Sequence, residues 1–126
     1  MVKPTICVDF DGVMNSYKSG YGPNYTVDHI TDPPTPYCAD AIKILRASYV
    51  VIIHSTRAVT DEGKQAIKDW LKKYDIVVDG IMAVKPPAMM YIDDRAIPFR
   101  GNWFETLEAV NNFKHWFLDD TWVEEK

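Results

Sequence analysis

The stretch Thr5-Ile6-Cys7-Val8-Asp9-Phe10-Asp11-Gly12 decides the fold expected for this chain of 126 residues. Residues 5–10 form a continuous run of apolar and β-branched side chains, which predicts a strand covered on both faces. The run ends in two aspartates and a glycine, so polar groups follow the strand at its carboxyl end. Further strands are predicted over 49–54, 79–84 and 90–93.

Helices are predicted between and after these strands. Thr35-Pro36 offers a cap with proline at the first helical position, for a helix that ends at about Ser48. Thr60 caps a second helix, and the capping-box-like pair of Asn102 and Glu105 opens a third. This alternation predicts an α/β protein with a mainly parallel sheet and helices on both faces. In such sheets, ligands bind beyond the carboxyl ends of the strands.

Two of the helices show apolar stripes, and such stripes are typical of faces buried against a core. We expect both stripes to be core rather than cofactor contacts. They consist of Ile67, Trp70, Leu71 and Tyr74 in the second helix, and of Trp103, Leu107, Val110, Phe113 and Phe117 in the third.

Length and composition indicate one domain over 1–126, with an irregular flap at about 16–36. The net charge of −4 gives no general attraction to nucleic acid or anionic lipid, although a local basic groove stays open as an alternative. The longest apolar stretches, of about five residues, are too short for a membrane helix. Neither a leader nor a disulfide framework is indicated by the sequence, so we expect a cytoplasmic domain with reduced Cys7 and Cys38.

Acidic, hydroxyl and basic groups follow the predicted strands. Asp9 and Asp11 follow the first strand, Ser55-Thr56-Arg57 follows the second, and Asp93-Asp94 follows the fourth. Lys85 stands just beyond the third strand. Because the carboxyl ends of parallel strands share one edge of a sheet, we expect these groups to converge there.

The clustered carboxylates predict a bound cation. Asp9 and Asp11 project to the same side of an extended strand, and two charges about 6 Å apart repel by roughly 3 kcal/mol at an effective dielectric near 20. A hard divalent cation with oxygen ligands relieves this repulsion, and Mg²⁺ is the ion expected. The alternative is a set of helix caps and solvated aspartates, which explains any single acid but not the whole set together with Lys85.

The same groups suit the hydrolysis of phosphate monoesters. One carboxylate attacks phosphorus to give an aspartyl-phosphate, and a second protonates the leaving oxygen and later deprotonates water. A metal ion and a lysine together neutralise the charge of the attacking carboxylate and of the phosphoryl group.

These residues resemble the motifs of the haloacid dehalogenase-like (HAD) hydrolases. The first motif of that superfamily is an apolar strand ending in Asp-x-Asp-Gly, here Asp9-Phe10-Asp11-Gly12. The second is a strand ending in Ser or Thr, here Ser55, and the third is a lysine, here Lys85. The fourth is an apolar strand ending in two acids, here Asp93-Asp94. All four occur in the expected order, and the resemblance implies a HAD-like Rossmannoid fold of three layers.

The resemblance also implies roles for individual residues. Asp9 would be the nucleophile, and Asp11 the general acid/base with its backbone carbonyl on the metal. Ser55 would hydrogen-bond the transferring phosphoryl group, and Lys85 would neutralise both Asp9 and the phosphate. Asp94 would bind the metal directly, whereas Asp93 would orient Lys85 or a metal-bound water. The implied metal ligands are therefore Asp9, Asp11, Asp94 and Asp93.

Three further residues are expected to contact the substrate. Gly12 lets backbone N–H groups approach phosphate oxygens, Thr56 adds a hydroxyl, and Arg57 can bind a phosphate with both arms of its guanidinium. An ion pair between Arg57 and a nearby aspartate is the alternative. We expect His54 to pack, and Arg95 to pair with an acid near the fourth strand.

The spacing between the motifs leaves no room for the cap domain that many HAD hydrolases carry. The chain resembles capless members, namely small HAD-like hydrolases of bacteria and phages and, more distantly, the phosphatase part of polynucleotide kinase/phosphatases. Asp11 favours phosphate over halide chemistry, since haloacid dehalogenases lack this second acid. The resemblance implies a Mg²⁺-dependent phosphatase with an open site.

The sequence leaves the substrate and the oligomeric state undecided. A nucleotide, a polynucleotide end, a sugar phosphate or a phosphoprotein all fit, although an acidic chain disfavours a long polynucleotide. The alternative function is a non-hydrolytic signalling module, either receiver-like and accepting phosphate on an aspartate or metal-binding without turnover, such as a catalytically inactive HAD-like scaffold. A receiver-like module needs that aspartate at the end of a central strand, where this chain has Ser55-Thr56.

Overall fold

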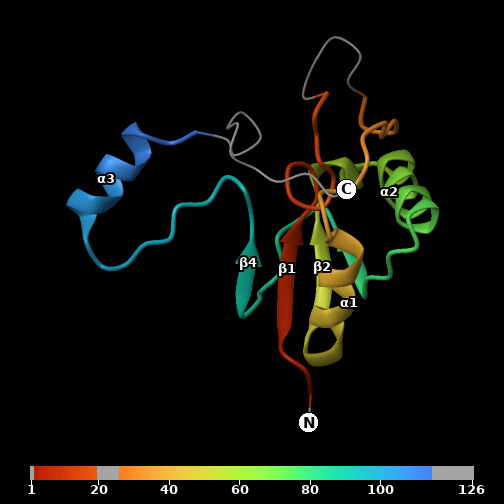
Figure 1. Cartoon of the computed structure of the whole chain (residues 1–126), viewed down its shortest axis with the longest axis horizontal. Helices are drawn as coiled ribbons and strands as arrows, with labels where there is room; N and C mark the ends of the chain where they lie inside the picture. Colours follow the sequence, from red (N-terminus) through yellow and green to blue (C-terminus); the bar gives the residue numbers. More distant parts are fainter. Residues whose placement is uncertain (1, 20–25, 115–126) are drawn as a thin grey trace.

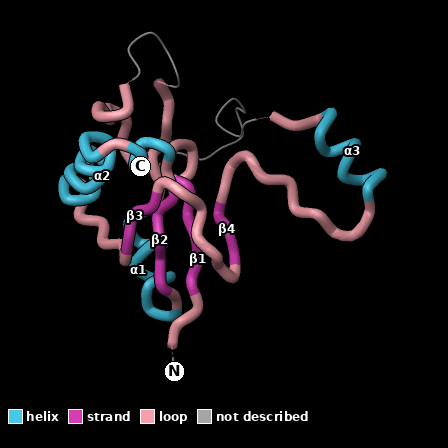
Figure 2. Tube along the Cα trace, turned by 180° about the vertical axis from the view of Figure 1, so that it is seen from behind, coloured by secondary structure: helices cyan, strands magenta, loops and turns pink. Residues whose placement is uncertain are grey.

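A computed structural model of the chain describes residues 2–19 and 26–114. The strands of the described residues form a parallel sheet in the order β3-β2-β1-β4; Figure 1 shows β4, β1 and β2 side by side, and Figure 2 shows all four. The predicted α/β class with a parallel sheet is confirmed. The strands are β1 (Thr5–Asp9), β2 (Val50–His54), β3 (Gly80–Met82) and β4 (Met90–Ile92).

The helices of the described residues are α1 (Cys38–Ser48), the short 3₁₀ helix η1 (Thr56–Val59), α2 (Asp61–Lys73) and α3 (Trp103–Asn111). Two of the predicted caps are present. The Thr60 side chain accepts a hydrogen bond from the Gly63 N–H at 3.0 Å, and Asn102 Oδ1 accepts one from the Glu105 N–H at 3.1 Å. None of the helices in this part of the chain has the length and apolar character that crossing a bilayer requires.

The cap predicted for the first helix is wrong. The Thr35 hydroxyl donates a hydrogen bond to the Val13 carbonyl at 2.7 Å, so it serves the loop after β1 rather than a helix. The helix begins two residues later than the proline suggests, at Cys38. Tyr37 precedes it in a left-handed conformation, with φ 64° and no side-chain cap.

The apolar core lies on one face of the sheet, between the strands and two helices. Alternate residues of β1 and β2 are side by side in register, and both α1 and α2 pack on them. The ring of Trp70 on α2 meets Phe10 edge-on, with centroids 5.0 Å apart. The principal members of the core are Ile6, Val8, Phe10, Met14, Cys38, Ile42, Val51, Ile53, Ile67, Trp70, Leu71 and Ile76.

The other face of the sheet is crossed by residues 83–89, which run from the end of β3 to the start of β4 (Figure 2). Cys7, which alternates with the core residues of β1, is only 2% exposed. The Tyr91 hydroxyl donates to the carbonyl of the buried Pro86 at 2.7 Å and so ties this segment to β4. Within the described residues, an extended segment rather than a helix covers this face.

The helix α3 stands away from the sheet (Figure 1), and the prediction that its apolar stripe is core is wrong. Trp103 is 67% exposed and Leu107 is 58% exposed, and the helix has no buried residue. The connection after β4 carries α3 outward, and its cap at Asn102 needs no tertiary contact. Periodicity therefore identified the helix but not its environment, and Phe117 of the predicted stripe lies outside the described residues.

Candidate active site and metal centre

A pocket of about 190 Å³ lies at the carboxyl ends of β1, β2 and β4. At about 30 Å³ per water molecule, this volume corresponds to about six waters, which leaves room for a phosphoryl group. Strand ends and the residues just beyond them form its wall, as the topology of a parallel sheet requires. The lining residues are Asp9, Asp11, His54, Ser55, Thr56, Asp93 and Arg95.

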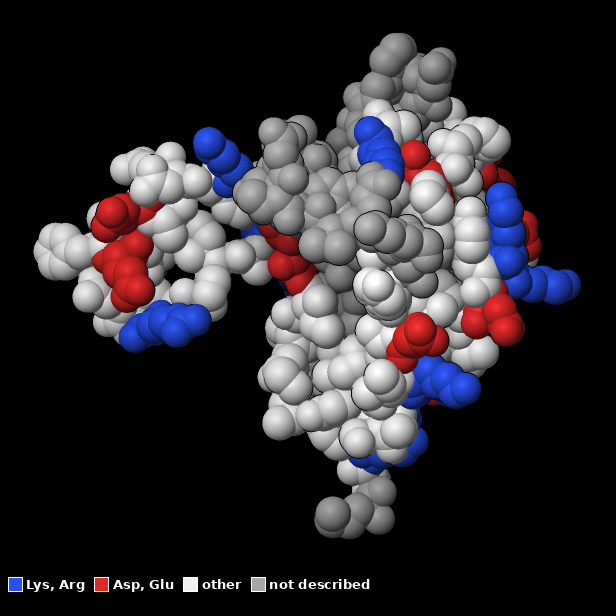
Figure 3. Space-filling model, in the orientation of Figure 1, with Lys and Arg blue, Asp and Glu red and all other residues white. Residues whose placement is uncertain are grey.

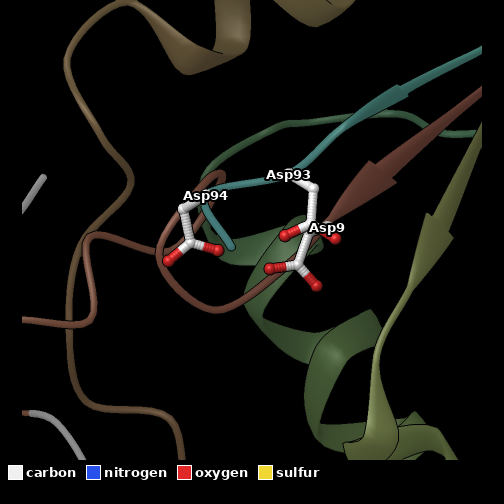
Figure 4. A group of neighbouring side chains, drawn as sticks. All are labelled: Asp9, Asp93 and Asp94. Carbon is white, nitrogen blue, oxygen red and sulfur yellow. The ribbon is translucent and has the colours of Figure 1, made fainter. Parts of the chain in front are cut away.

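Three carboxylates converge beside this pocket (Figure 4). Asp9, Asp93 and Asp94 each offer an oxygen, and these oxygens lie within 4.8 Å of one another. The convergence follows from strand pairing, because β1 and β4 are neighbours and Val8 lies beside Ile92. The residues that follow in each strand therefore meet at the same edge.

The environment of Asp9 penalises its negative charge. Burial raises the pKa of Asp9, and the carboxylates of Asp93, Asp94 and Asp11 raise it further, to about 8. The imidazole of His54 lies beside it on β2, with Nδ1 at 3.9 Å from Asp9 Oδ1. Asp9 is therefore an acid whose ionised form requires a compensating positive charge.

The carboxylate of Asp94 lacks such compensation among the described residues. Both of its oxygens are buried, and neither accepts a hydrogen bond from a described group outside the acid cluster. Within the cluster, a hydrogen bond between the Asp9 and Asp94 side chains is one of the causes of the raised pKa of Asp9, and it requires a proton on one of the two carboxyl groups. A buried unpaired carboxylate is costly, so ions of this kind are normally paired or coordinate metals. The donor set of three carboxylates suits a hard cation such as Mg²⁺ or Ca²⁺.

The backbone at Gly12 shapes the space around Asp94. Gly12 has φ +87°, and its N–H donates to the Asn15 carbonyl at 2.9 Å. A Cβ at position 12 would overlap the carboxylate of Asp94. Glycine therefore serves both the turn and the close approach of this carboxylate.

Asp93 has partners of its own. Its Oδ2 lies 3.2 Å from Lys85 Nζ, and its Oδ1 accepts the Arg95 N–H at 2.9 Å. Burial alone would raise the pKa of Asp93, but the hydrogen bonds from Arg95 and Lys85 lower it overall. The same hydrogen bond to Asp93 raises the pKa of Lys85, which keeps the ammonium charged at the edge of the cluster.

Asp11 is held at both oxygens. Asn15 Nδ2 donates to Oδ1 at 2.8 Å, and Arg57 Nε donates to Oδ2 at 2.8 Å. Its side chain keeps 12% exposure and lines the pocket. Asp11 is therefore oriented by the protein, and its carboxylate lies outside the three-acid cluster.

Ser55, Thr56 and Arg57 follow β2 in a tight turn. The Ser55 side chain accepts the Arg57 N–H at 3.2 Å and so caps η1, while the Ser55 N–H donates to the Met82 carbonyl of β3. Ser55 and Thr56 line the pocket. Arg57 is not part of its lining: it is 3% exposed and forms the ion pair with Asp11 that the sequence left as an alternative.

The structure thus gathers most of the predicted residues at one edge of the sheet. Asp9, Asp11, Ser55, Thr56 and Asp93 line the pocket, Asp94 and Gly12 adjoin it, and Lys85 is attached through Asp93. Arg57 lies behind Asp11.

Three residues of the site were not predicted as such from the sequence. His54 and Arg95 line the pocket, although only packing and an ion pair were expected of them. Asn15 holds Asp11, and its place four residues after Asp11 gave no sign of this contact. The alternation along β2 offered a signal for His54, because it shares a strand register with Asp9.

Two solved structures share this fold. A chain of the Pnkp1/Rnl/Hen1 complex matches with a TM-score of 0.52 and 18% identity, over 90% of this chain and 36% of that one. A conserved protein from Bacteroides thetaiotaomicron matches with a TM-score of 0.55 and 22% identity, over 96% of this chain and 99% of that one. The sequence matches no protein-family model and no curated protein.

These likenesses define the class as a small α/β protein of Rossmann-like fold. The chain spans about a third of its counterpart in the Pnkp1/Rnl/Hen1 complex and nearly all of the Bacteroides protein. At such identities the similarity concerns the fold, so the chemistry is argued from the site itself.

Proposed function

We propose that this protein is a Mg²⁺-dependent phosphatase that hydrolyses phosphate monoesters through an aspartyl-phosphate. One observation carries the proposal: three carboxylate oxygens lie within 4.8 Å of one another at the carboxyl ends of parallel strands, and one of these carboxylates is buried without a donor from the described residues outside the cluster. A pocket with room for a phosphoryl group adjoins them. The four motifs of the HAD hydrolases support the same conclusion.

In this proposal Asp9 attacks phosphorus. Its carboxylate lines the pocket, and the bond from its oxygen to phosphorus forms as the bond to the leaving oxygen breaks. Asp11 donates a proton to the leaving oxygen and later takes one from the attacking water. Ser55 and Thr56 hydrogen-bond the transferring group from the pocket wall. The N–H groups of Gly12 and Val13 donate to carbonyls of their own turn, so Gly12 serves the turn rather than the phosphate oxygens.

Asp9, Asp93 and Asp94 would hold the metal, and the backbone carbonyl of Asp11 is the further ligand that the family resemblance implies. When bound, Mg²⁺ supplies positive charge that stabilises the ionised Asp9 and the phosphoryl oxygens. Lys85 adds a second positive charge through Asp93. Direct coordination by Asp93 competes with its hydrogen bonds to Lys85 and Arg95.

The substrate is a phosphorylated small molecule or the end of a macromolecule. The pocket has room for the phosphoryl group and for part of the group that carries it. On the described part of the face in Figure 3, acidic and basic side chains are interspersed rather than gathered into a basic surface. This pattern favours a nucleotide, a short polynucleotide end or another small phosphate ester over a long polynucleotide.

Hydrolysis of p-nitrophenyl phosphate tests this proposal directly. We expect turnover with Mg²⁺, loss of turnover in EDTA, and recovery when Mg²⁺ is added in excess. Asp9→Asn should abolish turnover with an unchanged circular dichroism spectrum, whereas Asp11→Asn should still capture phosphate on the protein but release it slowly. Full turnover by Asp9→Asn, or equal rates in chelator, would contradict the proposal.

A screen of phosphorylated metabolites and 3′- and 5′-phosphorylated oligonucleotides identifies the substrate class. The screen also distinguishes the enzyme from a receiver-like module, which accepts phosphate once and does not turn over. The end of β2 disfavours that module, since it places His54 and Ser55 where a phosphate-accepting aspartate is required.

A further inference from the structure

Arg57 is a charged side chain buried almost completely, with 3% exposure. Arginine is rarely fully buried unless it is paired, because the loss of hydration must be offset by charge and hydrogen bonds. Arg57 lies in η1, directly after the two hydroxyl residues of the pocket wall. Its guanidinium nevertheless lies outside the pocket lining.

The guanidinium joins two parts of the chain that are far apart in the sequence. Its Nε donates to Asp11 Oδ2 at 2.8 Å. Its Nη1 donates to the carbonyls of Thr26 at 2.9 Å and Val27 at 3.2 Å. One planar group therefore binds both the pocket carboxylate of Asp11 and the backbone of the segment at 26–27.

The same segment is attached at its other end. The Ser16 N–H donates to the Pro33 carbonyl at 2.9 Å, and the Thr35 N–H donates to the Met14 carbonyl at 2.8 Å. The Trp70 indole also donates to the Asp32 carbonyl at 2.9 Å. Residues 32–35 are thus fixed to the loop after β1 and to α2. Apart from the local turn with His29, the hydrogen bonds that hold residues 26–27 within the described part of the chain come from Arg57.

We propose that Arg57 is a positioning residue that orients Asp11 for proton transfer and fastens residues 26–27 beside the pocket. The inference rests on the proposed function in one respect, the role of Asp11 as general acid/base. Asn15 holds the other oxygen of Asp11, so the two donors together fix the plane of the carboxylate. Arg57 acts through Asp11 and does not bind the substrate phosphate.

The geometry requires arginine rather than a positive charge alone. The guanidinium is planar with five donors in a fixed fork, whereas the lysine ammonium is a compact point charge. Lysine at position 57 retains the charge near Asp11 but does not reproduce three directed contacts to two separate segments. Arg57→Lys therefore separates orientation from charge.

Steady-state kinetics on p-nitrophenyl phosphate with Mg²⁺ test the effect on Asp11. Since general acid/base catalysis contributes typically 10²–10⁴-fold, we expect kcat of Arg57→Lys to fall at least ~10-fold. KM and inhibition by inorganic phosphate should stay within about threefold, and added guanidinium should partly restore kcat of Arg57→Ala. The matched control is Arg46→Ala, which removes a surface arginine–aspartate pair (Arg46 Nη2 to Asp79 Oδ1, 3.0 Å) and should leave kcat unchanged.

Hydrogen–deuterium exchange tests the fastening without any need for activity. Amides of residues 26–32 should exchange faster in Arg57→Lys and Asp11→Asn than in the wild type or in Arg46→Ala, while the Thr35 amide, which donates to the Met14 carbonyl, changes little. If Arg57→Ala does not fold, Arg57→Lys still decides the outcome. Unchanged exchange at 26–32 would overturn the fastening.

A large rise in KM or in the phosphate inhibition constant, with kcat retained, would make Arg57 a phosphate ligand and overturn its positioning role. An inactive wild-type protein contradicts the proposed function instead. In that case faster exchange at 26–32 in both Arg57→Lys and Asp11→Asn still supports the link between Asp11 and the segment.

Discussion

Gly12 lies so close to Asp94 that a Cβ at position 12 would overlap the Asp94 carboxylate. This contact joins the turn after β1 to the end of β4, the two segments that supply the carboxylate cluster. It also places the backbone beside the buried Asp94 carboxylate, which has no donor among the described residues outside the acid cluster. The turn and the candidate metal site are therefore one structural unit.

Gly12→Ala should weaken metal binding beyond its cost to the backbone. The positive φ of +87° costs about 1–2 kcal/mol for an alanine, and displacement of Asp94 should raise the Mg²⁺ dissociation constant at least ~10-fold. Isothermal titration calorimetry measures the affinity, and urea unfolding the stability. Gly101→Ala is the matched control, since Gly101 has φ +89° but nothing within 4 Å of an added Cβ; equal effects of the two variants on affinity would refute the contact.

The stability of the metal-free protein should fall as the pH rises from about 4 to 8. The folded state keeps a proton on Asp9, whose pKa is raised to about 8 by burial and by neighbouring carboxylates. The unfolded chain loses that proton near pH 3.9, so within this window folding binds a proton and is opposed by rising pH. Thermal unfolding at pH 5 to 8 should show this slope for the wild type and a shallower one for Asp9→Asn.

The same linkage predicts that Mg²⁺ stabilises the protein more at pH 8 than at pH 5. Metal and proton compete for Asp9, and the competition weakens as the proton becomes easier to remove. The increase in Tm with Mg²⁺ should therefore grow with pH. A Tm shift that is independent of pH would show that Asp9 is not a ligand.

Truncation of two tryptophans should change the free energy of unfolding by very different amounts. Trp70 is 4% exposed, packs against Phe10 and donates to the Asp32 carbonyl, so Trp70→Ala should cost about 3–5 kcal/mol in the free energy of unfolding. Trp103 is 67% exposed on α3, so Trp103→Ala should stay within about 0.5 kcal/mol. Urea unfolding of both variants is the measurement, and a large loss in Trp103→Ala would mean that α3 packs in solution.

The contrast between the buried helix α2 and the exposed helix α3 shows which features can be predicted from the sequence. The strand ends and the helix caps at Thr60 and Asn102 depend on local sequence patterns, which can be recognised directly. The convergence of the acids follows from the parallel topology that these patterns predict. The outward course of α3 depends on the connection after β4, which carries no periodic signal. The same limit applies to Thr35, whose hydroxyl could cap a helix but bonds to Val13 instead.

Contacts between distant segments were the least predictable part of the site. The bond between Arg57 and Asp11 joins residues 46 positions apart, and the sequence offered phosphate binding and an ion pair as equal alternatives. The guanidinium has acceptors away from the pocket because the fold places the carbonyls of residues 26–27 beside it, and the sequence gives no sign of this placement. Side chains with several suitable partners are assigned by the fold, not by their spacing.

Lys85→Met should lower activity without weakening metal binding. The Lys85 ammonium lies 3.2 Å from Asp93 and is 44% exposed, so its loss costs little stability but leaves the acid cluster more negative. We expect kcat/KM for p-nitrophenyl phosphate to fall about 10²-fold, as for removal of one group that stabilises transition-state charge, while Mg²⁺ affinity stays equal or increases. Lys43→Met, on the exposed side of α1, is the control; loss of Mg²⁺ affinity in Lys85→Met would show that Lys85 organises the metal site rather than the reacting phosphate.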